Sequence, residues 1–178
     1  MKYVYEFTNQ RKLTKAEFLK WFQKKALYII RKFEMIKNND IVAYENKGDF
    51  RGVVLENVLK MFAEKGNVEI VKLPTPKKKS TKIAIPSTID TESNKLIHEL
   101  IKGNAKNLKE LGPVVGKIIK PLYLFLDEEV LLYAKLKKLK FKKEIEKKDK
   151  ISNFIDDLDQ KHPEIKRAIV NSYLEIFK

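Results

Sequence analysis

Apolar and polar positions alternate at helical spacing over residues 14–33. The large apolar side chains fall on one face, at Phe18, Phe22, Ala26, Ile29 and Phe33. Thr14 and Glu17 have the spacing of a capping box, in which a hydroxyl and a carboxylate bind backbone N–H groups at the start of a helix. The pattern predicts an amphipathic helix from Thr14 to Phe33. Its remaining aromatic side chains are more often core or interface residues than groups that stack on bases.

Two short apolar runs after this helix are typical of buried strands. Ile41–Tyr44 follows an Asn-Asn-Asp turn, and Val68–Leu73 follows Gly66. Between the two runs, Glu45–Gly52 is predicted to be a polar loop and Val53–Glu64 a helix that Gly66 caps. A strand, a helix and a second strand at this spacing are typical of a right-handed βαβ unit. We therefore expect a parallel sheet.

The alternation of strands and helices continues after Pro74–Lys82, which is predicted to be an exposed loop because it holds two prolines and a lysine triplet. Lys82–Ile85 is predicted to form a third strand. Asp90 is the expected N-cap of the next helix, which ends before Gly103. Gly112–Leu122 is then predicted to be an extended segment with a strand at its isoleucine pair.

The C-terminal part is predicted to be helical. Asp127 is the expected cap of a helix that reaches at least Leu139, and the lysine-dense segment 135–150 is compatible with a helix. Residues 151–161 and 163–177 are predicted to form a helical pair, with Pro163 at the first position of the second helix. The predicted class is an α/β fold with a reduced parallel sheet and flanking helices. Residues 1–139 would form the α/β domain, and residues 140–178 a helical segment packed on it.

The charge balance points to a polyanionic partner. The 38 Lys and Arg exceed the 24 Asp and Glu, and the net charge is +14 at pH 7. A surplus of this size favours nucleic acid, although a solvated lysine-rich surface is the alternative. An anionic membrane fits less well, because lysines next to Pro and Ser lack the apolar face of an interfacial helix.

Cysteine is absent from the 178 residues. Disulfides, thiolate catalysis, iron–sulfur ligation and cysteine-based zinc sites are therefore excluded within this sequence. The two histidines, His98 and His162, are interpreted as structural residues. No apolar run approaches the roughly 20 residues of a membrane span, and the first residues lack the apolar core of a signal peptide. The expected location is the cytoplasm.

Several segments carry a pattern beyond their secondary structure. Residues 117–136, KIIKPLYLFLDEEVLLYAKL, are similar to the signature RIKPL-x-x-x-x-EKEV-x-x-YA. The matched positions are Ile119, Lys120, Pro121, Leu122, Glu129, Val130, Tyr133 and Ala134. Ile89, Asp90 and Glu92 match a nucleotide-site segment of the same proteins, and the turn Lys161-His162-Pro163 matches their closing helices. In this order the segments resemble the PP-loop ATP pyrophosphatases that thiolate tRNA, specifically the group of the cytoplasmic tRNA 2-thiolation enzymes.

The resemblance breaks at the phosphate loop, where that family has SGGKDS. This chain instead has Glu45, Asn46, Lys47, Gly48, Asp49 and Phe50. A phosphate cradle needs small residues whose N–H groups can approach the anion, and an acidic side chain would repel it. The resemblance then implies a degenerate loop without ATP activation. We accordingly expect no catalytic residue, no bound cofactor and no metal, and a chain that is not an enzyme.

The implied role is that of a non-catalytic subunit in a tRNA wobble-uridine 2-thiolation complex. Such a subunit would pair with an active PP-loop thiolase, as a heterodimer or larger assembly, and help to bind tRNA. The lysines predicted to contact tRNA are Lys77, Lys78, Lys79, Lys82, Lys142 and Lys143. One alternative is a free-standing basic RNA-binding module without an enzyme partner. Another is a reduced enzyme that still uses ATP.

Overall fold

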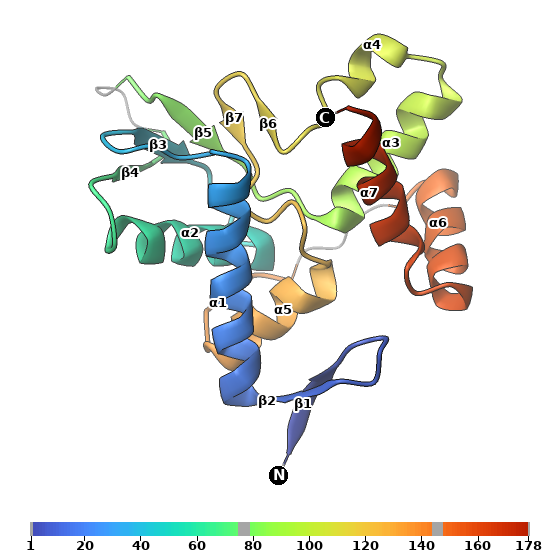
Figure 1. Cartoon of the computed structure of the whole chain (residues 1–178), viewed down its shortest axis with the longest axis horizontal. Helices are drawn as coiled ribbons and strands as arrows, with labels where there is room; N and C mark the ends of the chain where they lie inside the picture. Colours follow the sequence, from blue (N-terminus) through green and yellow to red (C-terminus); the bar gives the residue numbers. More distant parts are fainter. Residues whose placement is uncertain (1, 75–78, 144–147, 178) are drawn as a thin grey trace.

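A five-stranded sheet forms the centre of the computed structural model, which describes residues 2–74, 79–143 and 148–177 (Figure 1). Its strands are β3 (Ile41–Tyr44), β4 (Glu69–Lys72), β5 (Lys82–Ala84), β6 (Val114–Val115) and β7 (Ile118–Ile119). They lie in the order β4-β3-β5-β7-β6, with β6 antiparallel to β7 and the other pairs parallel. The predicted α/β class and parallel sheet are confirmed.

The helices form two groups around this sheet. They are α1 (Lys15–Lys32), α2 (Phe50–Ala63), α3 (Ile89–Ile101), α4 (Ala105–Leu108), α5 (Asp127–Leu136), α6 (Lys150–Lys161) and α7 (Ile165–Ile176). Helices α1, α2 and α5 pack together, and α3, α6 and α7 gather on the other side of the molecule (Figure 1). Each group has its own apolar cluster, and the cluster around α1, α2 and α5 is the larger.

Helix α1 forms as its sequence predicts. The Thr14 side chain and backbone exchange hydrogen bonds with Glu17 in a capping box. On the buried face, the Phe22 ring stacks between Phe125, at a centroid distance of 4.1 Å, and Tyr133, at 4.0 Å. Burying an aromatic side chain of this size stabilises the fold by about 2–3 kcal/mol. This stack joins α1 to α5 across more than one hundred residues of sequence.

An N-terminal hairpin was not predicted. Strands β1 (Tyr3–Glu6) and β2 (Lys12–Thr14) pair antiparallel just before α1. The Tyr5 ring stacks on Trp21 at 5.8 Å, and the Tyr5 hydroxyl donates to Glu129 at 2.9 Å. The hairpin is held by contacts with α1 and α5, which a local sequence pattern does not reveal.

The predicted start of the second helix was wrong. Helix α2 begins at Phe50 and not at Val53, because Asp49 is its N-cap and accepts a hydrogen bond from the Gly52 N–H at 3.0 Å. The helix ends at Ala63, so Gly66 is not its cap. The predicted polar loop is correspondingly shorter.

The lysine-dense segment after α5 was also predicted wrongly. Helix α5 ends at Leu136, and Lys138 adopts a left-handed backbone with φ 56° that ends the helical path before Leu139. Residues 137–143 form no helix, and residues 144–147 lie outside the described part of the chain. The driving force is apolar: Leu139 and Phe141 turn inward and pack against the larger cluster. The proposed domain boundary between residues 139 and 140 stays a prediction.

Two further boundaries differ from their predictions. Residues 112–122 are not one extended segment, because Gly116, with φ 57°, turns the chain between β6 and β7. Helix α7 begins at Ile165, which leaves Pro163 in the preceding turn. No helix within the described ranges has the length and apolar character needed to cross a membrane.

Candidate functional site

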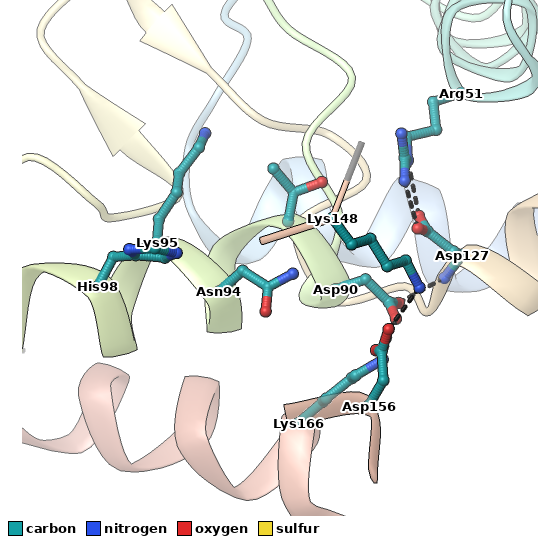
Figure 2. Close-up of a pocket in the computed structure, with 10 residues that line it drawn as sticks. Arg51, Asp90, Asn94, Lys95, His98, Asp127, Lys148, Asp156 and Lys166 are labelled. Carbon is teal, nitrogen blue, oxygen red and sulfur yellow. Dashed lines mark hydrogen bonds and ion pairs between the residues drawn. The ribbon is translucent and has the colours of Figure 1, made fainter. Parts of the chain in front are cut away.

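A polar cavity lies where the parallel strands end and the next helices begin. Helices α2, α3 and α5 start after the carboxyl ends of β3, β5 and β7, which is where open α/β folds bind their ligands. The cavity has a volume of about 250 Å³ (Figure 2). We call it the cleft, and its lining residues are Arg51, Asp90, Thr91, Asn94, Lys95, His98, Asp127, Lys148, Asp156 and Lys166.

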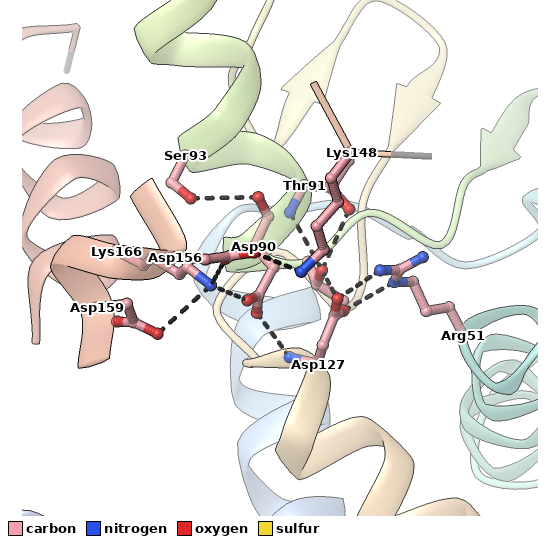
Figure 3. Close-up of polar contacts among 10 residues, drawn as sticks. Arg51, Asp90, Thr91, Ser93, Asp127, Lys148, Asp156, Asp159 and Lys166 are labelled. Carbon is pink, nitrogen blue, oxygen red and sulfur yellow. Dashed lines mark hydrogen bonds and ion pairs between the residues drawn. The ribbon is translucent and has the colours of Figure 1, made fainter. Parts of the chain in front are cut away.

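Asp127 ties three helix starts together at the cleft. It accepts a hydrogen bond from the Arg51 Nε at 2.7 Å and forms a second ion-pair contact with the same guanidinium (Figure 3). The Thr88 hydroxyl donates to Asp127 Oδ1 at 2.7 Å, and the Asp127 N–H donates to Asp90 Oδ2 at 2.8 Å. The two contacts between Asp127 and the Arg51 guanidinium fix the orientation of both side chains.

The prediction that Asp90 and Asp127 cap their helices was wrong. Helix α3 begins at Ile89 with Thr88 as its N-cap, and the N-cap position of α5 is Leu126, whose N–H donates to the Glu129 carboxylate at 2.9 Å. Both aspartates therefore lie inside the first turn. Their carboxylates are available for contacts between helices.

Lys166 joins the C-terminal helices to the cleft. Its ammonium lies 2.8 Å from Asp90 Oδ1, 2.8 Å from Asp156 Oδ1 and 3.4 Å from Asp159 Oδ2 (Figure 3). The Lys166 side chain is only 7% exposed. Burial lowers the pKa of Lys166, but the surrounding carboxylates outweigh burial and raise that pKa above its ordinary value. This lysine is a fixed cation that connects α3, α6 and α7.

The remaining lining residues make the cleft suited to a polar ligand. Lys148 pairs with Asp156 (Figure 2). Lys95 lies 3.2 Å from the Glu92 carboxylate. Within the described residues, the buried Asn94 Oδ1 has no hydrogen-bond partner. A cavity of about 250 Å³ is smaller than the roughly 300–1,000 Å³ of sites for drug-sized ligands. A phosphate or part of one nucleotide fits this volume.

The loop predicted to be degenerate uses its own side chains to bind its N–H groups. The Gly48 N–H donates to Asn46 Oδ1 at 2.8 Å, and the Gly52 N–H donates to Asp49 Oδ1 at 3.0 Å. A Cβ atom at Gly52 would lie 2.8 Å from the Asp49 oxygen and 2.9 Å from the Asn46 oxygen. These two donors are therefore already occupied, where a phosphate loop would leave them for the anion. Whether the loop has lost ATP binding stays a prediction.

Of the lysines predicted to bind tRNA, those within the described residues do not all lie together. Lys77 and Lys78 lie outside the described residues. Lys79 and Lys82 lie at the amino end of β5. Lys142 and Lys143 lie beyond the carboxyl end of the neighbouring strand β3, where the Lys142 N–H donates to the Gly48 carbonyl at 2.7 Å. The described lysines thus occupy opposite ends of the sheet, and their role stays a prediction.

Two buried carboxylates were not predicted to be central. Glu92 is fully buried, pairs with Lys120 at 2.8 Å and accepts a hydrogen bond from the Ser87 hydroxyl. Glu129 is also fully buried. Glu92, Lys120 and Glu129 are positions at which the sequence resembles the thiolating family, and that resemblance was the available signal.

Glu129 connects the N-terminal hairpin, α1, α5 and α7. Its carboxylate accepts from Tyr5, from Lys25 at 3.2 Å and from Arg167 at 2.6 Å. Burial raises the pKa of Glu129, but the charges of Lys25 and Arg167 outweigh it and the pKa is lowered. Burial lowers the pKa of Lys25 to about 8 although Glu129 opposes the shift. This is a structural network and not part of the cleft.

Comparison with solved structures shows the fold to be that of a tRNA thiolase. The chain is similar to the U34-tRNA thiolase NcsA from Methanococcus maripaludis, solved with its 4Fe-4S cluster, with a TM-score of 0.78 and 18% identity over 98% of this chain and 85% of that one. The sequence is also 26% identical to a probable sulfurtransferase of Methanocaldococcus jannaschii. That match covers 99% of this chain and 51% of the relative, so the chain spans about half of the relative's length. No family model matches the chain.

These comparisons overturn the expectation that the chain is not an enzyme. Both proteins are named for an enzymatic activity, sulfur transfer in one and tRNA thiolation in the other. Residues 45–50 had suggested a loss of activity, but this segment lies between β3 and the first residue of α2 and contributes none of the described side chains that line the cleft. The chain does not, however, have the ligands for the iron–sulfur cluster of the solved thiolase. Such clusters are held by Cys thiolates, and this sequence has no cysteine.

Proposed function

We propose that the chain acts in tRNA wobble-uridine 2-thiolation, as part of a sulfurtransferase-type enzyme that binds its substrate at the cleft. The observation that carries the proposal is a thiolase fold over 98% of the chain, combined with a polar cleft at the carboxyl ends of its parallel strands. The sequence similarity to a sulfurtransferase supports the same chemistry.

The charges of the cleft favour a phosphate-bearing ligand. Among its described lining residues, the cationic side chains are Arg51, Lys95, Lys148 and Lys166, against the carboxylates Asp90, Asp127 and Asp156. The carboxylates hold Arg51 and Lys166 in fixed positions, whereas the Lys95 and Lys148 side chains are 45% and 49% exposed and can also reach an anion in the cleft. A tRNA phosphate or the phosphate of an activated nucleotide satisfies this pattern.

The sulfur has to come from outside these residues. Thiolation replaces a carbonyl oxygen of uridine with sulfur, and a sequence without cysteine has no thiolate with which to carry that atom. A partner that holds the sulfur is therefore part of the proposal, and a second PP-loop thiolase chain is the candidate. In that assembly both chains would contact tRNA.

Reconstitution tests the proposal directly. Unmodified tRNA, ATP and a sulfide source are incubated with the candidate thiolase chain, with and without this protein, and 2-thiouridine is measured by mass spectrometry of the digested tRNA. We expect thiouridine to increase when this protein is present and the two chains to co-elute in size-exclusion chromatography. Equal thiouridine in both reactions would refute the proposal.

A variant pair assigns the effect to the cleft. Lys95→Ala removes a cleft cation, whereas Lys65→Ala removes an exposed lysine that does not line the cleft. We expect thiouridine formation to fall roughly 10-fold for the first variant, since one charged hydrogen bond contributes about 1.5 kcal/mol, and to stay unchanged for the second. Equal effects of the two variants would exclude the cleft as the site.

A further inference from the structure

A second cavity lies between the end of α1, strand β6 and the end of α7. Its volume is about 730 Å³, and among the described residues it shares no lining side chain with the cleft. We call it the α1–α7 pocket. Apolar and aromatic groups form most of its wall, including Phe33, Val114, Tyr173 and Phe177, and Lys32 and Lys109 complete it. A volume of this size is ordinary for a site that holds one nucleotide-sized group.

The aromatic wall of the α1–α7 pocket is fixed before any ligand binds. The Tyr173 hydroxyl donates to the Leu108 carbonyl at 2.8 Å, and the Tyr173 ring packs on Phe177 at a centroid distance of 4.8 Å and an interplanar angle of 31°. Phe177 nevertheless remains 39% exposed. An aromatic ring held from one side and open on another is a platform on which a flat ring can stack.

A basic stripe on α1 leads to this pocket. Lys20, Lys24, Tyr28 and Lys32 are exposed and lie four residues apart, so they line one face of the helix, with Arg31 beside them. Tyr28 is 57% exposed. In the described part of the chain, no carboxylate lies within ion-pair distance of these basic side chains or of Lys109.

Lys32 joins the stripe to the pocket. Its ammonium lies 5.7 Å from the centre of the Tyr28 ring and 5.4 Å from the centre of the Phe33 ring, and Lys32 also lines the pocket. An exposed tyrosine, a row of cations and an aromatic pocket therefore form one continuous surface. Figure 1 shows α1 along the front of the molecule, with its C-terminal end toward β6 and β7.

We propose that the α1 stripe and the α1–α7 pocket together bind single-stranded RNA, with phosphates along the stripe and one unstacked base against Phe177. Surfaces that bind single strands combine a row of cations with aromatic rings on which bases stack. A protein partner would match the apolar wall, but interfaces between proteins are depleted in lysine, and the lysines here reach the pocket itself. The proposal rests on the proposed function only in taking RNA as the substrate.

The test uses a fluorescein-labelled octauridylate and the full chain, with binding followed by fluorescence anisotropy. Phe177→Ala is expected to weaken binding about 10-fold, the equivalent of losing one base–aromatic stack, and Phe177→Trp to restore it. Phe154→Ala is the matched control, because Phe154 is a 59% exposed phenylalanine on α6 that does not line the pocket. Thermal unfolding of each variant confirms that the fold is kept.

The stripe is tested by salt dependence. The double variant Lys24→Gln, Arg31→Gln is expected to lower the slope of log Kd against log salt by about 1.4, or 0.7 for each lost phosphate contact, whereas Lys65→Gln leaves the slope unchanged. An oligonucleotide duplex of equal charge is expected to be insensitive to Phe177→Ala, since its bases are not available for stacking.

The outcomes separate this proposal from the proposed function. If thiolation depends on the chain but Phe177→Ala and Phe154→Ala bind octauridylate equally, the pocket proposal is wrong and the proposed function stands. If octauridylate binding depends on Phe177 while thiolation is unaffected by the chain, only the pocket proposal survives. A protein captured at this surface that octauridylate cannot displace would also overturn it.

Discussion

Lys25 is a lysine whose charge is opposed by its surroundings. Its ammonium lies 4.8 Å from the Trp21 ring centre, 4.5 Å from the Phe125 ring centre and 3.2 Å from the Glu129 carboxylate. Burial lowers the pKa of Lys25 to about 8, below the roughly 10.4 of an unfolded chain. Between these two values the unfolded state binds more protons than the folded state. The free energy of unfolding therefore rises with pH in this window.

We expect that rise to be on the order of 1 kcal/mol between pH 8 and 9; nearer pH 10 the buried tyrosines, whose pKa values are raised by burial, reverse the trend. Urea unfolding at several pH values measures it. In Lys25→Met the rise should disappear, whereas an exposed lysine changed to methionine at position 65 should keep it. A wild-type protein whose stability stays flat from pH 8 to 9 would contradict this account of Lys25.

Lys166 has the opposite relation to its surroundings, since carboxylates on three sides favour its charge. Replacing Lys166 by Met leaves Asp90, Asp156 and Asp159 without their common cation. Breaking a fully buried pair costs about 3–5 kcal/mol, and because these carboxylates are 19–29% exposed we expect roughly 2 kcal/mol of destabilisation at pH 7.

The deficit of the Lys166→Met variant should shrink at low pH. In the wild type, burial raises the pKa of Asp156, but the charges of Lys148 and Lys166 outweigh burial and the net pKa is lowered. The stability that this carboxylate contributes is therefore lost only as the pH falls through the lowered pKa. In the variant Asp156 keeps Lys148 but loses the second cation that lowers its pKa, so it accepts a proton at a higher pH than in the wild type. Denaturant midpoints at pH 7 and pH 4, with the exposed Lys161→Met as control, decide the matter; a deficit equal at both pH values would assign it to packing.

At the scale of single elements, α1 could be predicted and the segment after α5 could not. Helix α1 has a capping box and an apolar face within its own sequence. Residues 137–143 are rich in lysine, which favours helix, but they are not helical because Leu139 and Phe141 pack against the larger apolar cluster. The cleft shows the same limit. Arg51 and Asp127 are 76 residues apart, and their pairing appears only once the sheet has brought the starts of α2 and α5 together.

The start of α2 offers a prediction in which two local effects oppose each other. Gly to Ala inside a helix normally stabilises by about 0.5–1 kcal/mol. At Gly52, however, the new Cβ would lie 2.8 Å from Asp49 and 2.9 Å from Asn46, whose oxygens are held by hydrogen bonds. We expect Gly52→Ala to lower the free energy of unfolding by about 1 kcal/mol, since the N-cap contact of Asp49 is lost.

Gly66→Ala is the matched control for that substitution. A Cβ atom at Gly66 would meet its nearest neighbours at 3.8 and 4.0 Å, an ordinary contact distance. Its free energy of unfolding should be unchanged or slightly higher. Thermal melts followed by circular dichroism compare the two variants, and a stabilised Gly52→Ala would mean that the loop can move aside at little cost.

At the scale of the whole molecule, the two helix groups are joined by charges as well as by the sheet. Arg167 on α7 reaches Glu129 on α5, and Lys166 reaches Asp90 on α3. The sequence resemblance indicated that these segments belong to one fold, and the comparisons bear out that fold. Only the assembled structure shows that adjacent residues of one helix turn, 166 and 167, connect to different halves of the molecule.

The whole-molecule arrangement also ranks the lysines that the sequence predicts for tRNA. Lys142 lies beside Gly48 at the carboxyl ends of the strands, the same end of the sheet as the cleft, whereas Lys79 and Lys82 lie at the amino end. If tRNA enters the cleft, the double variant Lys142→Glu, Lys143→Glu should lower the slope of log K against log salt by about 1.4–1.8, the loss of two phosphate contacts. The variant Lys79→Glu, Lys82→Glu carries the same change of net charge and should alter the slope less. The slopes of the two variants are measured by filter binding of tRNA between 50 and 200 mM salt. Equal slopes would show that the overall net charge of +14 governs binding, and not the end of the sheet at which the lysines lie.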